Sequence, residues 1–401
     1  MHKIGCIALE KLVNLDGGGA RDESQFCDMG HQATYIEVRE KEVLTVVGKI
    51  QVQRNYYYDR FCGEGWCPKD RELSIVGSSF SPGVRRIMGR VGSSRPFAVG
   101  AEEILEIGGL EVNPKSIERM CHEVGNEADR FLSLRAPAEK GTQETMYISI
   151  DGTGVPVLKV ETDGRRGKGA DGIAKTREVK LGCVFTQTAF DDEGYPIRDE
   201  NSTTYVGAIE TAEVFGHRIR REAERRGYWQ AKRRCVIGDG APWIWNIVSD
   251  HFWDAIQIVD LYHAREHYWA CARVFFATDE QRQRVWAGCR KEELDNGDVD
   301  AVIRAVKQLR TRSKASRKLR DSTVNYFQQN KHRMRYSEFR AQGLFVGSGV
   351  IEAGCKTIIS QRLKQSGMHW TVDGANSIIA LRCCLLSRRW EDFWTYVAEV
   401  A

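Results

Sequence analysis

Apolar and polar residues alternate along the chain from Ala33 to Tyr58, a period of two that predicts β-strands. Within this stretch, residues 43–54 read as two strands joined at Gly48 and Lys49. The apolar side chains of this hairpin are expected to be buried and to hold it together: Val43, Val46, Ile50 and Val52. The first part of the chain therefore contains a small β-unit.

The apolar spacing changes to three and four residues between Pro68 and about residue 135, which indicates helices. One helix begins at Ser81 and Pro82, a second covers about 97–107, and a third begins at Asn113 and Pro114, an N-cap followed by proline in the first turn. Helix, short glycine-containing turn and helix is also the outline of a helix-turn-helix. Lys115 and Arg119 would then lie on the recognition helix. A plain three-helix bundle gives the same pattern.

A polar linker at 136–144 separates this region from a second pattern, in which strands and helices alternate. Strands are predicted at 145–151, 177–188, 202–208, 233–238 and 255–260, and helices at 211–226 and from about 243. Three strands, helix, strand, helix, strand is the order of an α/β fold of the RNase H-like type. Residues 262–345 read as a helical insertion, and a final helix is expected over about 371–397.

These patterns divide the chain into parts with different expected roles. The predicted division is a β-hairpin module resembling a degenerate zinc ribbon (1–70), a helical DNA-binding region (71–140), an RNase H-like core (141–261), a helical basic insertion (262–345) and closing helices (346–401).

Composition narrows the class of protein. The chain has 401 residues, 42% of them hydrophobic, but lacks an apolar run of the roughly 20 residues needed to cross a membrane. Its start shows no secretory signal pattern, and its 12 cysteines are scattered rather than spaced as a disulfide framework. We therefore expect a cytoplasmic protein with reduced thiols.

The net charge of +4 is modest, but basic residues gather in one short stretch. This basic stretch contains Arg310, Arg312, Lys314, Arg317, Lys318 and Arg320. It could contact DNA phosphates, or it could be a solvated helix face.

Three acidic residues stand in contexts that suit one catalytic site. Asp151 follows a buried apolar run, Asp239 closes another, and Glu352 opens a helix-like segment rich in Lys and Arg that includes Lys356. In the predicted fold the first and fourth strands are parallel neighbours, which brings Asp151 and Asp239 together. Carboxylate oxygens suit Mg²⁺ or Mn²⁺, and two such ions about 3.5–4 Å apart can serve a phosphodiester exchange.

Asp260 and His263 form a second candidate group where the fifth strand meets the insertion. Because this strand lies one position further from the first, Asp260 is less suited to bind metal directly. The pair could orient a scissile strand, or it could be a structural contact.

Cysteines bracket the N-terminal hairpin, and a zinc ribbon has this layout. Cys27, His31, Cys62 and Cys67 could supply four ligands, but their spacings are irregular. The alternative is a metal-free β-knuckle with buried cysteines.

The chain resembles bacterial insertion-sequence transposases of the ISKra type, within the larger group related to Mutator-like elements. The resemblance rests on residues 148–154, 236–245, 259–263, 347–352 and 368–370. It implies a DDE catalytic domain of the RNase H-like fold in which Asp151, Asp239 and Glu352 form the triad. Asp260 and His263 correspond to the Asp/Cys-x-x-His motif of these enzymes.

The resemblance also implies the activity and the partners. We expect metal-dependent cleavage at the ends of a mobile element, followed by strand transfer, by a homodimer or higher oligomer on double-stranded DNA. Lys115, Arg119, Lys356 and the basic stretch are the candidate DNA contacts. A non-catalytic DNA-binding regulator descended from such an enzyme is the alternative, and a repair nuclease is a third.

The chain departs from the family's pattern at the hairpin. Similar proteins usually carry paired cysteines where this chain has Met29 or Gly30 and Asp59, whereas Cys62 and Cys67 match. Because losing one ligand generally costs a structural zinc site much of its affinity, we predict weak or absent zinc.

Overall fold

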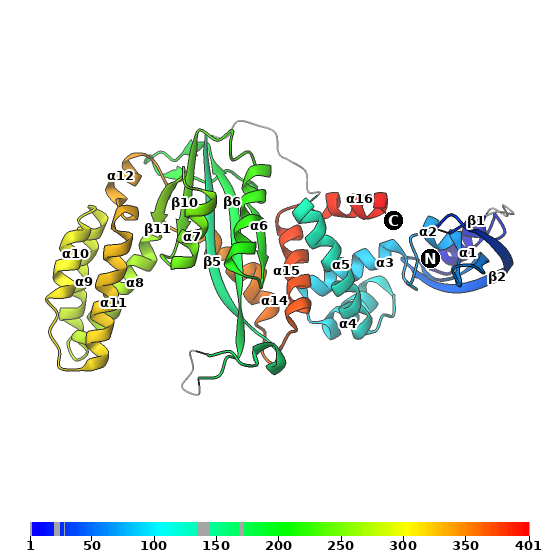
Figure 1. Cartoon of the computed structure of the whole chain (residues 1–401), viewed down its shortest axis with the longest axis horizontal. Helices are drawn as coiled ribbons and strands as arrows, with labels where there is room; N and C mark the ends of the chain where they lie inside the picture. The colour runs from blue at the N-terminus through cyan, green and yellow to red at the C-terminus, as the bar shows by residue number, and fades with distance from the viewer. Residues whose placement is uncertain (1, 20–24, 28, 135–143, 168–171, 401) are drawn as a thin grey trace. The chain divides into compact units, whose positions relative to one another are not determined.

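The computed structural model of the chain describes residues 2–19, 25–27, 29–134, 144–167 and 172–400 (Figure 1). The chain divides into two compact units. One, the terminal unit, combines the residues up to Phe131 with those from Arg389 onward; the other, the central unit, runs from Leu132 to Arg388. The predicted polar linker at 136–144 lies outside the described residues, except for Glu144.

The terminal unit contains a four-stranded sheet in the order β1-β2-β3-β4. Its strands are β1 (Gln25–Phe26), β2 (Gln32–Thr45), β3 (Gly48–Asp59) and β4 (Glu64–Trp66). The predicted junction at Gly48 and Lys49 is wrong, because Thr45 pairs with Gly48 and the turn is formed by Val46 and Val47. Gly48 instead begins β3 with a φ of 121°, a conformation that favours glycine.

The predicted alternation of buried and exposed residues holds near the turn of the hairpin, whereas residues 34–40 of β2 are exposed. Val43, Ile50 and Val52 form a core with Ile75, against which residues of α1 (His2–Val13) also pack. Val46 does not join them: its position in the turn leaves it 49% exposed. The prediction that Val46 stabilises the hairpin by burial is therefore wrong, whereas burial of the other three residues is confirmed.

Four helices follow the sheet: α2 (Pro68–Glu72), α3 (Pro82–Ser94), α4 (Phe97–Gly108) and α5 (Pro114–Leu134). The predicted start signals are confirmed, since Ser81 Oγ accepts the Val84 amide and Asn113 Oδ1 accepts the Lys115 amide at 2.8 Å. Gly109 ends α4 in the left-handed conformation, with a φ of 62°.

The terminal unit is completed by a helix from the other end of the sequence, α16 (Trp390–Val400). The ring of Phe393 lies 5.6 Å from that of Phe131, and Trp390 and Trp394 lie against Gly89 of α3. An ion pair joins Arg86 to Glu391. Residues more than 250 positions apart in sequence thus share one aromatic core.

The single helix predicted over 371–397 is wrong, because the structure contains two helices there. α15 (Val372–Leu386) ends before Ser387, and α16 begins at Trp390. Arg388 between them adopts a left-handed conformation with a φ of 62°, which interrupts the helix. The Ser387 hydroxyl accepts the Tyr205 amide and so fastens the end of α15 to the central sheet.

The central unit is built on a mixed five-stranded sheet in the order β11-β10-β5-β6-β9. These strands are β5 (Thr145–Pro156), β6 (Thr176–Gln187), β9 (Thr204–Ala208), β10 (Arg233–Gly238) and β11 (Ile256–Val259). β5 pairs antiparallel with β6 and parallel with β10. With α6 (Ala212–Arg225) after β9 and α7 (Pro242–His251) after β10, the predicted succession of strands and helices is confirmed.

Helices cover both faces of this sheet. A side chain at Gly182 would meet Phe215 and Ile219 of α6, whereas Leu181 lies on the side of Gly354, in α13 (Gly349–Gly354). Since successive residues of a strand point to opposite faces, α6 and α13 pack on opposite faces. α15 lies on the same face as α13, because a side chain at Gly207 would meet both Leu181 and Ile379.

The segment between β11 and α13 is helical, as predicted, and lies beyond the β11 edge of the sheet (yellow-green to orange in Figure 1). It contains α8 (Leu261–Phe275), α9 (Glu280–Asp295), α10 (Val299–Lys307), α11 (Lys314–Asn330), the 3₁₀ turn η2 (Lys331–Arg333) and α12 (Tyr336–Ala341). The buried Tyr336 hydroxyl donates to the Val259 carbonyl and ties the segment to β11. Across the described parts of the chain, no helix combines the length and apolarity that a membrane crossing requires.

Candidate active site

Three aspartates lie at the same level on three neighbouring strands. Ile150 pairs with Gly238 and Gly238 pairs with Val259, so that Asp151, Asp239 and Asp260 each come one residue later. The Asp260 amide donates to the Gly238 carbonyl at 2.8 Å and continues this register past the end of β10. The carboxyl ends of β10 and β11 therefore meet the middle of the longer β5 in an acidic row.

Asp151 points to the face of the sheet that α13 covers. It is the register partner of Leu181, and partners across a ladder share a face. The Cys355 thiol donates to its Oδ2 at 3.3 Å, and the Gly152 amide to its Oδ1 at 2.7 Å. Burial raises the pKa of Asp151 and the Asp239 carboxylate adds to the rise, although the thiol and the amide oppose it.

Asp239 lies half-buried at the end of β10, where the chain turns into α7. Its Oδ1 accepts the Ala241 amide at 2.8 Å, and its backbone carbonyl accepts the Tyr326 hydroxyl of α11 at 3.1 Å. Gly240 has a φ of 95°, and a side chain there would meet the Tyr326 ring at 2.6 Å. The turn that carries Asp239 is therefore shaped by close packing against α11.

Asp260 is fully buried and is held by hydrogen bonds. It is the N-cap of α8: its Oδ1 accepts the His263 amide at 2.6 Å and lies 3.2 Å from His263 Nδ1, while its Oδ2 accepts the Ser348 amide. Burial raises the pKa of Asp260, but these hydrogen bonds outweigh burial and hold it below its usual range. The bond with Asp260 raises the pKa of His263 to about 9, although burial opposes this rise. His263 is therefore an imidazolium at neutral pH.

Glu352 reaches the same place from α13. Its Oε1 accepts the Ser348 hydroxyl at 2.9 Å and lies 3.9 Å from His263 Nδ1. Its side chain is 50% exposed, so the carboxylate is open to solvent. Directly after α13 the helix widens into a π-helical stretch, η3 (Cys355–Ser360), which presents the Cys355 thiol to Asp151. Such stretches concentrate at functional sites.

Only some of these residues lie close enough together to share one metal ion. Ligand atoms of Asp260, His263 and Glu352 lie within 4.8 Å of one another, whereas Asp151, Asp239 and Glu352 form no such group in the described part of the chain. Asp239 nevertheless influences the pKa of both Asp151 and His263. His263 therefore interacts with Asp151 and Asp239 through its charge and lies 3.9 Å from Glu352.

The predicted basic contacts occupy different elements. Of the basic stretch, Arg310 and Arg312 lie in the loop before α11, and Lys314, Arg317 and Lys318 are exposed on its first turns. Arg320 is half-buried and donates to the Leu309 carbonyl and to Asp321. Lys356 is exposed beside Cys355. In the terminal unit, Arg119 is exposed on α5 and Lys115 pairs with Glu118.

Sequence reasoning missed Ser348, Cys355 and Tyr326. Ser348 joins Asp260 to Glu352 through its amide and its hydroxyl, and Cys355 caps Asp151. Tyr326 stacks on His267 with ring centroids 3.6 Å apart and reaches the Asp239 carbonyl. Ser348 and Cys355 lie within four residues of Glu352, so their closeness in sequence to a predicted site residue could have indicated them. No feature of the sequence indicates Tyr326.

The chain belongs to the uncharacterised protein family UPF0236, whose family profile matches residues 30–387. No curated protein matches it. Among solved structures, it is similar to a chain described as "Drosophila P element transposase strand transfer complex", with a TM-score of 0.26 and 10% identity over 78% of this chain and 80% of that one.

Proposed function

We propose that this protein is a DDE-type DNA transposase that cleaves the ends of a mobile element and joins them to target DNA. The observation that carries the proposal is the register of the central sheet together with the position of α13. Asp151 and Asp239 lie on adjacent parallel strand positions, and α13 brings Glu352 over the face to which Asp151 points. These are the three residues that the resemblance to insertion-sequence transposases singles out.

The topology supports the same proposal. With its strands numbered in chain order, the central sheet has the order 5-4-1-2-3, with the second strand antiparallel to the first and the fourth parallel to it. This order is the one expected of the RNase H-like fold that we propose. The helical segment between β11 and α13 corresponds to the insertion that the resemblance implies before the catalytic glutamate.

The donor atoms of the site suit a hard divalent cation. Asp239 Oδ2 and Glu352 Oε2 have no hydrogen-bond partner among the described residues. The negative charge of Asp239 adds to the rise that burial causes in the pKa of Asp151, and a cation would relieve this charge. Asp151, Asp239 and Glu352 would hold Mg²⁺ or Mn²⁺. When bound, such ions activate water or a 3′-hydroxyl and stabilise the leaving oxygen.

The chain's own residues orient the site around these acids. Asp260 fixes the ring of His263 through Nδ1, which leaves Nε2–H of the imidazolium to donate to a phosphate oxygen. Ser348 holds the side chain of Glu352 in place. The exposed cations of the basic stretch, with Lys356, supply sequence-independent phosphate contacts on the central unit. Lys115 and Arg119 remain the proposed contacts of the terminal unit, and the enzyme acts as a dimer or higher oligomer on DNA.

The test is cleavage of duplexes that carry the DNA flanking the reading frame, with Mg²⁺ or Mn²⁺ present. Asp151→Asn, Asp239→Asn and Glu352→Gln should each lose cleavage by at least about 10³-fold, and a triple variant should lose little more, because residues acting as a unit are non-additive. Asp192→Asn, an exposed aspartate outside the site, is the matched control.

Binding of the same duplexes should survive in all these variants. Normal cleavage by Asp239→Asn together with inactivity of Asp260→Asn would show that the second catalytic acid is Asp260. Sequence-specific DNA binding by a wild-type protein that cleaves no duplex with either ion would favour the non-catalytic regulator.

A further inference from the structure

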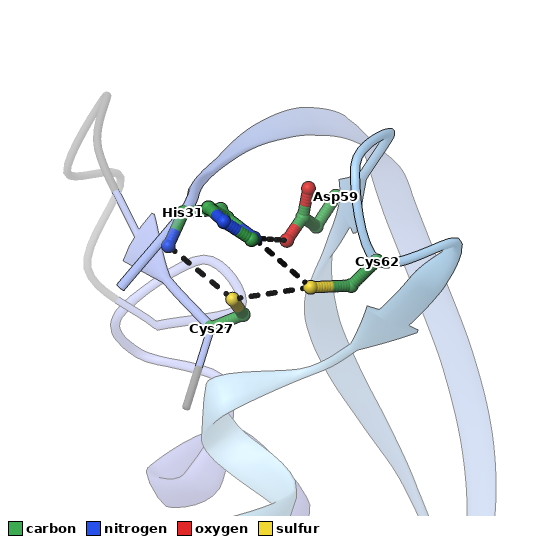
Figure 2. Close-up of side chains that lie close together, drawn as sticks. All are labelled: Cys27, His31, Asp59 and Cys62. Carbon is green, nitrogen blue, oxygen red and sulfur yellow. Dashed lines mark hydrogen bonds and ion pairs between the residues drawn. The ribbon is translucent and has the colours of Figure 1, made fainter. Parts of the chain in front are cut away.

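Two turns at one end of the terminal sheet bring four metal-binding side chains together (Figure 2). Cys27 and His31 flank the turn between β1 and β2, where the Cys27 amide donates to the His31 carbonyl at 2.9 Å. Asp59 ends β3, and Cys62 lies in the turn before β4. Because β2 and β3 are antiparallel, the start of one and the end of the other lie at the same edge. The four side chains point toward one another.

The distances between the donor atoms are those of a small coordination sphere. Cys27 Sγ lies 3.6 Å from Cys62 Sγ, and His31 Nδ1 lies 3.1 Å from Cys62 Sγ and 3.6 Å from Asp59 Oδ2. All four donors lie within 4.8 Å of one another. Zinc bonds of about 2.0–2.3 Å in a tetrahedron place donor atoms about 3.3–3.8 Å apart. Small side-chain adjustments would therefore suffice to close a tetrahedral site.

Asp59 is the strongest indication of a bound cation, because its carboxylate is fully buried and only one of its oxygens has a hydrogen-bond partner among the described residues. Its Oδ1 accepts the Phe61 amide at 2.8 Å, which turns Oδ2 toward His31. Oδ2 is buried and, within the described ranges, has no hydrogen-bond partner. A buried carboxylate oxygen without a partner costs free energy, and a cation at the centre of the cluster would remove that cost.

We propose that Cys27, His31, Asp59 and Cys62 bind one zinc ion, which clasps the two turns of the terminal sheet. Two thiolates, an imidazole and a carboxylate are a closed four-ligand set that suits borderline-soft Zn²⁺ better than Mg²⁺ or Ca²⁺. Binding releases the two thiol protons to solvent. All four positions are taken by protein ligands, so the ion stabilises the fold and has no open position for substrate.

This proposal replaces the weak or absent zinc predicted from the sequence and changes the ligand set. Cys67 does not belong to the cluster: it is the buried N-cap residue of α2, and burial raises the pKa of its thiol. Asp59 takes the place in the coordination sphere that the sequence pattern predicted for Cys67. The proposal is independent of catalysis in the central unit.

The experiment measures zinc in the full-length chain, purified under a thiol-free reductant, by elemental analysis and by titration of the metal-stripped protein with Co²⁺. We expect about one metal ion per chain, with the visible bands of tetrahedral Co²⁺ and thiolate-to-cobalt charge transfer. Cys62→Ser and Asp59→Asn should lose most of the bound metal. Cys67→Ala and Cys289→Ser, which remove a buried and an exposed thiol outside the cluster, should retain it.

A gain-of-function variant guards against simple misfolding. Asp59→Cys replaces the carboxylate with a third thiolate, so it should bind Co²⁺ at least as tightly and show stronger charge-transfer absorption. Metal content well below one in the wild-type chain would overturn the proposal. Retention by Asp59→Asn together with loss from Cys67→Ala would also overturn it, as would a Cys27–Cys62 disulfide that persists under reductant and excludes the metal.

Discussion

Ser348 links two residues of the candidate active site that come from different parts of the sequence. Its amide donates to Asp260, which caps α8, and its hydroxyl donates to Glu352 on α13. Ser348 is buried, and a side chain at the preceding Gly347 would meet the Tyr262 ring at 2.9 Å. One hydroxyl group therefore holds the Glu352 side chain in place.

Removing that hydroxyl should weaken catalysis without abolishing it. Ser348→Ala keeps the amide bond to Asp260 but frees Glu352, and the loss of one such hydrogen bond predicts a decrease in cleavage of about tenfold. Ser348→Thr retains a hydroxyl and should restore most of the activity. Ser322→Ala, which removes an exposed helix hydroxyl outside the site, should have no effect. Equal cleavage by Ser348→Ala and wild type would contradict this role.

A single residue, His251, should make the stability of the central unit depend on pH. Burial lowers the pKa of His251 from its usual 6.5, and the neighbouring His217 ring, 4.8 Å away, adds to the shift. The unfolded chain therefore binds this proton more readily than the folded chain, so the stabilisation is complete above about pH 6.5 and is lost as pH falls below it. Denaturant unfolding of the central unit should show a free energy that declines on acidification, with a shallower decline in His251→Gln. Identical pH slopes in the two proteins would contradict the assignment.

At the scale of elements, α11 connects the basic stretch to the candidate active site. Its first turns carry Lys314, Arg317 and Lys318, and a later turn presents Tyr326 to the Asp239 carbonyl. Cations at a helix N-terminus oppose the helix dipole and cost stability. The positions of these cations are therefore unfavourable for the protein alone. Such positions are expected where an anionic partner binds and compensates the charge.

Neutralising the exposed part of the basic stretch should separate its contribution to DNA binding from its effect on the stability of α11. Arg310→Gln, Lys314→Gln, Arg317→Gln and Lys318→Gln together should weaken binding to all DNA sequences about equally and reduce the salt dependence by roughly one unit of slope for each phosphate interaction removed. The same change should leave the melting temperature equal or higher. The control removes Arg304 and Lys307, which lie in the last turn of α10, where loss of charge should lower stability. Weaker binding to one DNA sequence alone would contradict a phosphate-contacting role.

Periodicity and start signals sufficed to predict most elements, because the strands of the central sheet and the helix caps are written in local sequence. The predictions from sequence fail where tertiary packing or backbone conformation overrides the local pattern. Val46 continues the alternation but occupies a turn, and Arg388 interrupts an apolar helical pattern only through its backbone conformation. Asp59 stands where the family pattern has a cysteine, and only the structure brings it together with Cys27, His31 and Cys62. Tyr326 reaches Asp239 across 87 residues, a distance that no local pattern encodes.

At the scale of the whole molecule, the terminal unit is discontinuous in sequence. Its aromatic core joins Phe131 of α5 to Phe393 and Tyr396 of α16, while the central unit is a continuous segment. The stability of the first unit therefore depends on residues encoded after the second.

Removal of the residues from Arg389 onward should damage the terminal unit selectively. Loss of α16 uncovers Phe131 and the surface around Gly89, and deleting buried aromatic residues costs about 3–5 kcal/mol each. Thermal unfolding of the shortened protein should show an early transition that is absent from the full chain, and the transition of the central unit should be unchanged. Coincident transitions at the original temperature would show that α16 contributes little.

The discontinuity also sets a sequence of events during synthesis. Residues up to Phe131 leave the ribosome first but lack part of their core until α16 has emerged. At rates of about 5–20 residues per second, the intervening segment delays completion by on the order of 10–50 s. The terminal unit, proposed to read DNA, thus matures only after the unit proposed to cut it. A chain whose synthesis stops before α16 would lack a stable terminal unit. It would therefore not compete with complete molecules for their DNA sites.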